Sequence, residues 1–558
     1  MYFQRSLNNL VFFALLVTTL SSCSKENDDA YEVKDFQKAL KAISPHENIE
    51  KFESISYKVT GASYEWDEPT VNYPNPINTS NYRYDFISNL FERKAAVHYT
   101  QFEPKQPFSY STAGFNIVIN DKKGMISGEY DFKSYFLNMK YPQSLHASRI
   151  EALLKTYQMV NPLYLCKIVS RQAQLSIINN KVVIPSIIQG LSFEIEFDRF
   201  TYLPLCVRIS ESDFLRGDIE FKITYDDWKP VSGFLMPSKF HYYLGDRLFR
   251  SEKISDIVIN PAIKDDQFAL GEIASPVTYD TPNGWMGFIY SQWYNRWFDK
   301  GLLFDQPLNN GAWILEDHNL EPYGLLSQYV GDNIKIIGRP DHSLYSVAIK
   351  TSKGVFIYEP TLNNFWTRSV LNAAKSKFPG QQITGTIVSH AHAAVVSGIR
   401  EAAYETGNIY VGLTGKDIIS KALEAKHSLN PDALSLNPRE CKITEISEKT
   451  ILADGELELY FLNSNSNLPG SHSTDMIIAY VPAYQTIIQS ELLWNGPFKR
   501  VWVGQAANKY SDGTKKELKQ RALFLNNFIT KNNIIVKRVI SVQGGLGSYE
   551  DLLNIINN

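Results

Sequence analysis

The sequence lacks several features that would decide its class at once. It has no surplus of cations, because 56 Lys and Arg side chains stand beside 59 Asp and Glu side chains and the formal net charge is -3. Proteins that bind nucleic acid through its phosphates need a basic surface, and no run of Lys and Arg interleaved with aromatic residues occurs. Nucleic acid is therefore not an expected partner.

Cysteine is also scarce, with 4 in 558 residues. Cys23 falls in the N-terminal segment, whereas Cys166, Cys206 and Cys441 are widely spaced in the body of the chain. Three separated cysteines make no disulfide framework, and there is no Cys-x-x-Cys motif for metal or redox chemistry. We expect these three side chains to be small buried hydrophobic groups.

Three common catalytic signatures are missing as well. There is no Gly-x-Ser-x-Gly elbow and no Gly-x-Gly-x-x-Gly after a strand. The segment Leu413–Lys416 lacks the upstream Gly of a phosphate loop and is followed by Asp417 instead of Ser or Thr. Serine hydrolase, dinucleotide and nucleotide chemistry are therefore unsupported.

Long apolar runs are absent except near the start of the chain. A short opening with one Arg, a mostly apolar stretch at 10–20 and the small residues before Cys23 are the parts of a secretion signal. The stretch is shorter than the roughly 20 residues that span a bilayer. Because it ends on Cys, the segment resembles a bacterial lipobox, in which Cys23 carries lipid and becomes the mature N-terminus. A membrane anchor or a cleaved soluble-secretion signal is the alternative.

Residues 24–29 read Ser-Lys-Glu-Asn-Asp-Asp. This acidic cluster is similar to surface-export signals on lipoproteins of some Gram-negative bacteria, and a solvated tether is the alternative. We expect an exported protein that is bound to the outer membrane through its lipid, on the periplasmic or the cell-surface side.

Strand patterns dominate the chain between residues 33 and 272. Helical spacing of apolar residues is confined to 35–43 and 147–159. Elsewhere apolar and polar residues alternate with a period of two, which is typical of half-buried strands. The clearest examples are residues 115–119, 191–197 and 218–225, with turn signals at 216–218 and 231–233. The pattern predicts an antiparallel β domain.

A string of turn and edge residues in this domain resembles the half-barrel of lipoprotein-carrier-like domains. It consists of Phe197-Asp198, Leu203-Pro204, Gly217-Asp218, Tyr225–Trp228 and Gly233–Pro237. The resemblance implies a concave sheet. Such a sheet can hold an acyl chain or a peptide, but support of the second domain is the simpler expectation.

The division of the chain follows from composition. Punctuating residues at 273–284 predict a linker, and strands alternate with helices from about Tyr323, which favours α/β layers. An aromatic helix expected between these segments is interpreted as a packing face rather than a ligand box: Trp285, Tyr290, Trp293, Tyr294 and Trp297. The predicted parts are a signal peptide (1–22), an acidic tether (23–32), the β domain (33–272), the linker (273–284) and a C-terminal domain (285–558).

The strand predicted at 385–389 runs directly into His390-Ala391-His392, and a helix is expected to continue to Ala403. Two His residues at i and i+2, where a strand ends and the chain turns, can point both imidazoles at one metal ion. Taken alone, the pair is a weak signal, and a core or surface role is the alternative.

The order of the later segments strengthens the metal interpretation. They are His472 in the turn Pro469–Asp475, an apolar strand at 476–480 before Val481-Pro482, a strand at 486–489 that ends in Ser490-Glu491, the segment 539–545 and a helix from Tyr549. From about Tyr323 to the C-terminus this series resembles the metallo-β-lactamase superfamily. The resemblance implies an αββα sandwich, so the expected class is α+β, with the antiparallel half-barrel first and the sandwich second.

Carried over residue by residue, the resemblance implies one intact metal position. His390, His392 and His472 match its three His ligands, and Glu491 stands where the family has a bridging Asp. Three neutral imidazoles and one open or carboxylate-filled position suit a single tetrahedral Zn²⁺ ion, which activates water near neutral pH.

The second metal position of the family is dismantled. Ala394 and Val395 replace an Asp and a His, and Gln543 or Gly544 falls where the last His is expected. Because the Asp that positions water and receives protons is the one replaced by Ala394, catalysis would need Asp475 or Glu491 in its place.

The sequence therefore favours a cell-envelope lipoprotein that is a mono-zinc hydrolase of unnamed substrate, with a degenerate metal site. A catalytically silent binding or scaffold protein that kept the fold is the alternative. His342, on a loop before a strand, is expected either to line the mouth of the site or to be simply solvated. The other His residues, including His427, have no partners in the sequence pattern.

Overall fold

The computed structural model describes most of the chain from residue 33 onward. The described residues are 33–65, 77–104, 113–127, 143–145, 147–171, 176–178, 181–184, 193–264, 266–271, 326–338, 345–361, 364–463, 475–490, 492–493, 512–542 and 544–557. Cys23, the predicted linker, the aromatic stretch Trp285–Trp297 and His342 lie outside these ranges. Within them, no helix is both long enough and apolar enough to cross a membrane.

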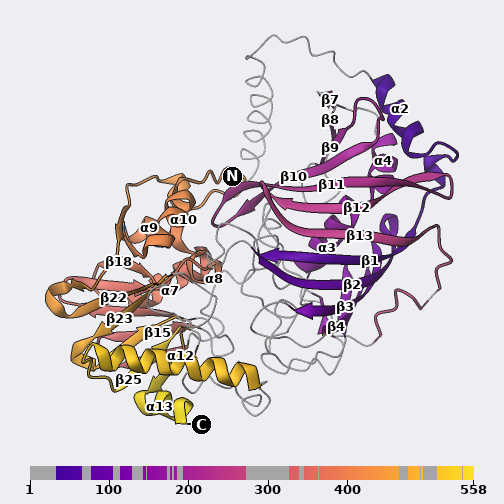
Figure 1. The fold of residues 1–558 in the computed structure, drawn as a ribbon. Helices are drawn as coiled ribbons and strands as arrows, with labels where there is room; N and C mark the ends of the chain where they lie inside the picture. The colour runs from indigo at the N-terminus through magenta and orange to yellow at the C-terminus, as the bar shows by residue number, and fades with distance from the viewer. Residues whose placement is uncertain are drawn as a thin grey trace.

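The N-terminal part is built on one sheet of 13 strands in the order β6-β5-β4-β3-β2-β1-β13-β12-β11-β10-β9-β8-β7 (Figure 1). Every pair in it is antiparallel. Its strands are β1 (Ile55–Glu65), β2 (Ile77–Asn89), β3 (Lys94–Pro104), β4 (Ala113–Asn120), β5 (Lys123–Ser127), β6 (Gln143–Ser144), β7 (Ser176–Ile178), β8 (Lys181–Ile184), β9 (Phe193–Phe197), β10 (Pro204–Asp213), β11 (Gly217–Val231), β12 (Phe234–Leu244) and β13 (Arg247–Ile259).

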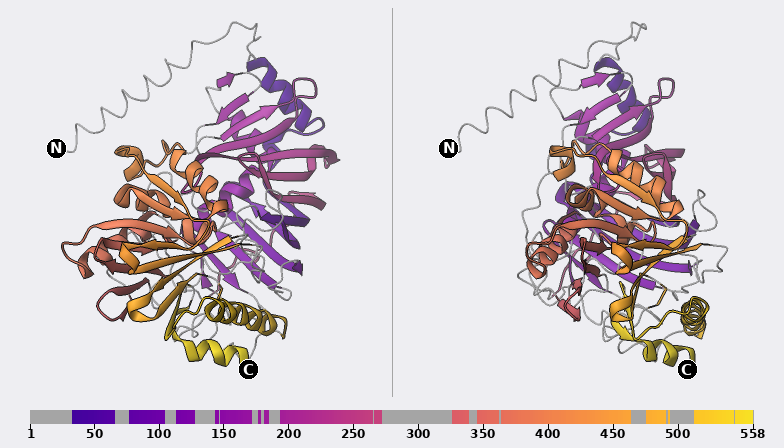
Figure 2. Two further views of the ribbon diagram at one scale, coloured as in Figure 1. Left: turned by 60° about the vertical axis from the view of Figure 1, so that its left-hand side comes forward. Right: turned by 90° about the vertical axis from the view of Figure 1, so that its left-hand side faces the viewer.

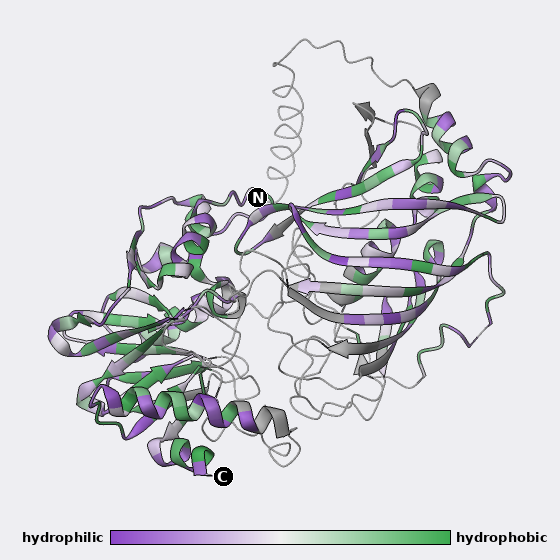
Figure 3. Cartoon of the chain, viewed as in Figure 1, coloured by the Kyte–Doolittle hydropathy of each residue, from purple (hydrophilic) through white to green (hydrophobic). Residues whose placement is uncertain are grey.

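One face of this sheet is covered by helices and forms a single hydrophobic core (Figure 1). The helices are α2 (Val33–Ile43), α3 (Ala147–Met159) and α4 (Pro162–Ser170). Along β9, Phe193, Ile195 and Phe197 are buried, whereas the two Glu residues between them are half-buried. This alternation explains why the period-two pattern was readable in the sequence, and Figure 3 shows the same banding along the long strands.

A buried ion pair lies inside that core. The Arg250 Nε atom donates to Glu252 Oε1 at 2.7 Å, and Tyr82 and Tyr84 donate to the same carboxylate at 2.9 and 3.0 Å. Tyr242 donates to it at 2.5 Å. Because a buried charge is costly unless it is paired and hydrogen-bonded, these three hydroxyls are what allow the pair to sit in an apolar interior.

The C-terminal part contains two further sheets. The first has the order β14-β15-β16-β17-β18-β19-β20 and is antiparallel up to β17 and parallel from β17 to β20. Its strands are β14 (Leu326–Val330), β15 (Ile334–Gly338), β16 (Ser346–Thr351), β17 (Gly354–Tyr358), β18 (Ile383–Val388), β19 (Asn408–Val411) and β20 (Lys442–Glu445).

The second sheet runs β21-β22-β23-β24-β25-β26, with only the β24–β25 pair parallel. Its strands are β21 (Thr450–Leu452), β22 (Leu457–Asn463), β23 (Asp475–Val481), β24 (Thr486–Gln489), β25 (Arg538–Ser541) and β26 (Gly545–Ser548). Every residue of β23 and β24 is buried, so these strands read in the sequence as apolar runs rather than as alternating patterns.

Three hydrophobic clusters show how the C-terminal layers stack. One cluster joins residues of both sheets, so their inner faces pack together. A second joins the first sheet to α7 (Asn364–Lys377), and a third joins the second sheet to α12 (Asp512–Lys531) and α13 (Tyr549–Asn557) (Figure 1; Figure 2). The expectation of a mixed α+β chain with large antiparallel sheets is confirmed.

The helix predicted to run from His390 to Ala403 is wrong in detail. The structure has two helices there, α8 (Ala393–Val396) and α9 (Ile399–Thr406), followed by α10 (Leu413–Glu424) and α11 (Ala433–Leu436). The break has a cause in the fold, because the Gly398 amide donates to the Pro360 carbonyl at 3.0 Å instead of continuing α8.

The N-terminal sheet touches the C-terminal part through the first residues of β11. The Asp218 carboxylate accepts hydrogen bonds from the Ser428 and Leu429 amides, each at 2.9 Å, and the Asp218 amide donates to the Lys426 carbonyl at 2.6 Å. Gly217 adopts a φ of +73° there, and a Cβ atom on it would lie 2.1 Å from the Lys426 oxygen. Only Gly allows so close an approach of the two backbones.

We therefore expect Gly217→Ala to weaken this contact. Gly245→Ala is the matched control, because Gly245 also has a positive φ of +62° but its Cβ would meet only the Ile219 side chain at an ordinary 3.7 Å. The control should cost about 1–2 kcal/mol of backbone strain, and Gly217→Ala clearly more, measured by denaturant unfolding. Equal losses for the two variants would contradict the close approach.

Candidate metal centre

The ends of several strands meet at one edge of the two C-terminal sheets. β17 and β18 are parallel neighbours, so Glu359 and Ser389, which follow them, leave the first sheet on the same side. The second sheet joins them there, because the Ile477 amide near the start of β23 donates to the Ser389 carbonyl at 2.8 Å. The Tyr358 hydroxyl also donates to the Ile477 carbonyl, at 2.7 Å.

His390 and His392 lie at this edge and are both withdrawn from solvent. Their exposed fractions are 1% and 7%, and their ring centroids are 5.8 Å apart with an interplanar angle of 36°. Imidazoles that bind one zinc ion through nitrogens at about 2.1 Å have ring centres roughly 5 Å apart. The two rings are therefore close to the separation that a shared ion requires.

A neighbouring hydroxyl engages one of the two ring nitrogens of His390. Ser389 Oγ and His390 Nδ1 are 2.7 Å apart. If Nδ1 carries the proton and donates to Ser389, Nε2 keeps its lone pair for a metal, which is the usual arrangement of ligating imidazoles. The Ser389 hydroxyl also contacts the Tyr358 hydroxyl, so the orientation of the ring is tied to β17.

Glu359 supports the turn and was not identified from the sequence. It is fully buried, and its Oε1 accepts a hydrogen bond from the Ser389 amide at 3.2 Å. Its φ of +68° is uncommon for a residue other than Gly, Asn or Asp. The available signal was an acidic residue directly after the apolar strand Gly354–Tyr358, where a loop begins.

Asp475 lies at the same edge but is engaged with a helix. Its Oδ2 accepts a hydrogen bond from the Thr414 amide at 2.8 Å, in the first turn of α10. Gly412 precedes that helix, and a Cβ atom there would lie 2.8 Å from the same oxygen. The carboxylate thus caps α10 from another segment of the chain. Burial raises the pKa of Asp475, which the Thr414 hydrogen bonds only partly offset.

Val395, which stands where the family has a His ligand, is part of the hydrophobic core. It is fully buried in the cluster between the two sheets, and its amide donates to the His392 carbonyl at 2.9 Å. The bulky side chain of Tyr484 belongs to the turn after β23 and lies against Gly331, so it does not block the site. That turn is at the other end of β23 from Asp475.

His472, Glu491 and Gln543 lie outside the described residues, so their predicted roles stay predictions. The strands nearest to His472 and Glu491 are described. Asp475 begins β23, and Gln489 ends β24, which pairs with β23 so that Ile488 lies opposite Ala479. Among the described residues, no group of three or more His, Cys, Asp or Glu side chains could hold a metal ion.

Comparison with known proteins gives structural likenesses only. Similar solved structures are metallo-β-lactamases. The metallo-β-lactamase from Pontibacter korlensis shares 15% identity over 42% of this chain and 98% of its own, with a TM-score of 0.30. The one from Hirschia baltica shares 14% over 42% and 96%, with a TM-score of 0.29, and the DIM-1 enzyme 14% over 42% and 95%, with 0.30. At these values the likeness does not by itself assign a fold or an activity.

No family model matches the chain, and a search of curated proteins gives no match either. The two described imidazoles fit a zinc ion in type, burial and separation, and the third is predicted three residues before β23.

Two substitutions separate the helix-capping role of Asp475 from the cost of burying its charge. Asp475→Asn keeps an acceptor for the Thr414 amide and removes a charge whose burial is unfavourable, so it should leave stability at pH 7 unchanged or higher. Asp475→Ala should be less stable than the Asn variant by about 1 kcal/mol, the typical value of a helix cap. The difference between Asn and wild type should shrink as the pH falls toward the raised pKa. Urea unfolding of the wild type and both variants at several pH values measures these differences in stability.

Asp432 is the control, because its pKa is shifted in the opposite direction from that of Asp475. It caps α11 through the Ser435 amide at 2.8 Å, and although burial opposes its charge, the hydrogen bond and charge of Arg400 lower its pKa to about 2. Asp432→Asn should therefore destabilise the fold at pH 7, and that loss should fade between pH 4 and pH 2. Equal behaviour of the two Asn variants would contradict the assignment.

Proposed function

We propose that the C-terminal part is a metallo-β-lactamase-like αββα domain that holds one zinc ion through His390, His392 and His472. The observation that carries the proposal is the buried His390–His392 pair, with ring centroids 5.8 Å apart at the end of β18. The stacking of helix, sheet, sheet and helix supports the family, and the strands that flank His472 and Glu491 end or begin at the same edge as the pair.

The proposed activity is metal-dependent hydrolysis. When bound, zinc would supply Lewis acidity and make water more acidic than it is in bulk, which suits hydrolysis near neutral pH. Ser389 orients the His390 ring, and Glu359 fixes the Ser389 amide. Glu491 is the proposed fourth ligand. Asp475, whose pKa burial raises, is the proposed group for holding or passing a proton at this edge.

The proposal extends to the rest of the chain. The first part is proposed to be a half-barrel that supports the hydrolytic domain, in agreement with its single antiparallel sheet and one covered face. Cys23 is proposed to carry lipid and to anchor the protein to the outer membrane, on the periplasmic or the surface side. The substrate is proposed only as an envelope or small molecule.

Zinc content tests the metal site directly. A chain that begins at Ser24 keeps every residue that the structure describes, and it should contain about one zinc ion after purification without chelator. His390→Gln and His392→Gln should each lose most of that zinc, because two remaining imidazoles bind it weakly. Ser389→Ala should weaken zinc affinity about 10–100-fold, as loss of a hydrogen-bonded partner does elsewhere. Elemental mass spectrometry and chelator competition measure both.

His427→Gln is the matched control, because His427 is also buried, with 4% of its surface exposed, but lies outside the motif. It should keep its zinc. A wild-type chain that takes up no zinc even when the ion is added would reject the metal site. That result would favour the alternative, in which the protein is a catalytically silent binding protein.

Lipidation is tested independently. Cells that express the full chain and are fed a labelled fatty acid should incorporate label into the protein, and Cys23→Ser should abolish it. Cys166→Ser, at a buried cysteine of the β domain, is the control and should keep the label. Label that survives Cys23→Ser would show that lipid is attached elsewhere, and a wild type without label would show that the proposed lipid anchor is absent.

A further inference from the structure

The turn between β9 and β10 carries the most exposed large hydrophobic side chain of the described residues. This side chain is Phe200, and 75% of its surface is exposed. A single exposed apolar side chain is common on protein surfaces and does not by itself indicate a binding site. The surroundings of Phe200 add three observations: a rigid turn, exposed cations and the place where the described chain begins.

The turn holds the backbone of Phe200 in a fixed position. Asp198 Oδ1 accepts hydrogen bonds from the Phe200 amide at 3.0 Å and from the Thr201 amide and hydroxyl at 2.6 and 2.9 Å. The Asp198 carbonyl accepts a further bond from the Tyr202 amide at 2.8 Å. Because these bonds fix the turn, Phe200 needs little reorganisation to pack against another surface.

Exposed cations lie beside this turn. The Arg199 guanidinium is 4.7 Å from the centre of the Phe200 ring, and the Lys38 ammonium of α2 donates to the Tyr202 hydroxyl at 3.2 Å. Lys41 follows Lys38 by three residues and therefore lies on the same face of the helix. All three cations are exposed. The protein thus presents an aromatic ring and several positive charges on one surface.

This surface lies where the described chain begins. The rings of Phe36 in α2 and Phe197 in β9 pack edge to face with centres 6.0 Å apart, so the helix and the turn share one support. α2 and the β7–β9 end of the sheet lie far from α12 and α13, at the opposite end of the protein (Figure 1; Figure 2). Val33 is ten residues after Cys23, at most about 35 Å of extended chain. A lipid on Cys23 would keep this end of the protein close to the membrane.

We propose that this surface binds to the anionic phospholipid surface of the membrane in which the chain is anchored. The docking surface consists of Lys38, Lys41, Arg199 and Phe200. The inference rests on the proposed lipid at Cys23. Aromatic side chains suit the boundary between headgroups and acyl chains, and Lys and Arg attract anionic headgroups, each strengthening binding about five-fold.

The acidic tether makes the charge of the docking surface important. Residues 24–32 contain four acidic residues and one Lys, so anionic headgroups repel this segment. The cations of the docking surface oppose that repulsion. Binding through a lipid and through a basic surface together is stronger than through either alone, and it gives the anchored protein one orientation on the membrane.

A fluorescent label in the turn tests the proposal. The chain beginning at Ser24 receives six His residues at its N-terminus and is held by nickel-chelating lipid on vesicles of phosphatidylglycerol and phosphatidylethanolamine, so the result does not depend on lipidation. Cys441 is replaced by Ser because it was expected to be buried, like Cys166 and Cys206, but is only partly so. Thr201→Cys then carries a nitrobenzoxadiazole label, which nitroxide-labelled lipids quench on contact.

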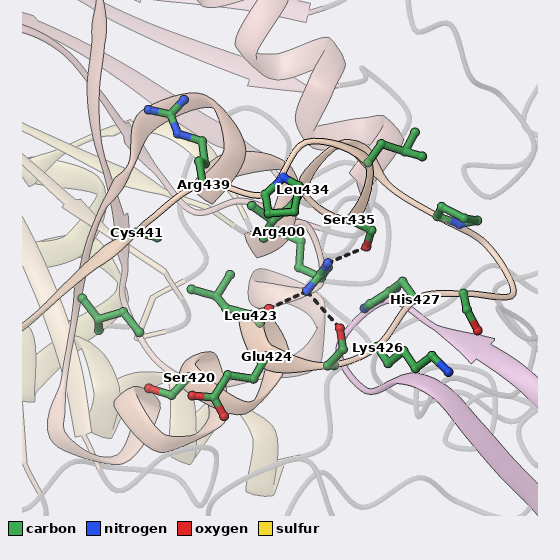
Figure 4. Close-up of a pocket in the computed structure, with 16 residues that line it drawn as sticks. Arg400, Ser420, Leu423, Glu424, Lys426, His427, Leu434, Ser435, Arg439 and Cys441 are labelled. Atoms are coloured by element: carbon green, nitrogen blue, oxygen red, sulfur yellow. Dashed lines mark hydrogen bonds between the residues drawn. The ribbon is translucent and has the colours of Figure 1, made fainter. Parts of the chain in front are cut away.

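We expect strong quenching at position 201 and little at position 451. Ile451→Cys places the same label on an exposed apolar site of the C-terminal part, where 60% of the side chain is exposed. Phe200→Ser should reduce the quenching at position 201 at least two-fold without changing the Tm. Leu436→Ser is the matched control and should leave the quenching unchanged, because Leu436 is 67% exposed but lines a pocket of the C-terminal part (Figure 4).

The contribution of charge is measured with the same label. Lys41→Glu, or phosphatidylcholine in place of phosphatidylglycerol, should reduce the quenching at least two-fold, whereas Lys531→Glu at the exposed end of α12 should not. Equal quenching at positions 201 and 451 would overturn the docking surface even if Cys23 carries lipid. Quenching that neither Phe200→Ser nor Lys41→Glu reduces would overturn it as well. Quenching at position 201, together with failure of Cys23 to take up lipid in cells, would reject the anchor and retain the docking surface.

Discussion

The hydrogen bond from the Ile477 amide to the Ser389 carbonyl is the contact on which the candidate site depends. It joins the two C-terminal sheets where β18 ends, one residue before His390. Glu359 holds the Ser389 amide from β17, and Tyr358 reaches the Ile477 carbonyl, so three strands fix one turn. Rings on a turn held this way need little reorganisation to bind an ion, and this favours binding.

The sequence was most informative where a strand is covered on one side. Alternation along β4, β9 and β11 predicted strands because each has one face in the core. The pairing of β1 with β13, which brings Ile55 beside Ile259, could not be predicted, because no local pattern encodes so distant a neighbour. The helix break at Gly398 was missed for the same reason, since its amide bonds to a loop from another strand.

The same distinction between local and long-range features applies to the residues of the candidate site. His390 and His392 were predicted because their spacing and the preceding strand are local features. Glu359 and the capping role of Asp475 depend on which strand ends and which helix begins beside them, and this is set by the packing of two sheets. His427 had no partner in the sequence pattern, whereas the fold buries it near the charges of Arg400, Asp432 and Asp218. A residue of this kind is recognised only after folding places it.

His390 and His392 are proposed to share one metal ion with His472. Crystals of the chain beginning at Ser24, grown with zinc and measured on both sides of the zinc absorption edge, would show that ion. We expect one anomalous peak about 2.1 Å from a nitrogen of each of the three rings. The absence of a peak there, with the two described rings packed against protein atoms alone, would contradict it.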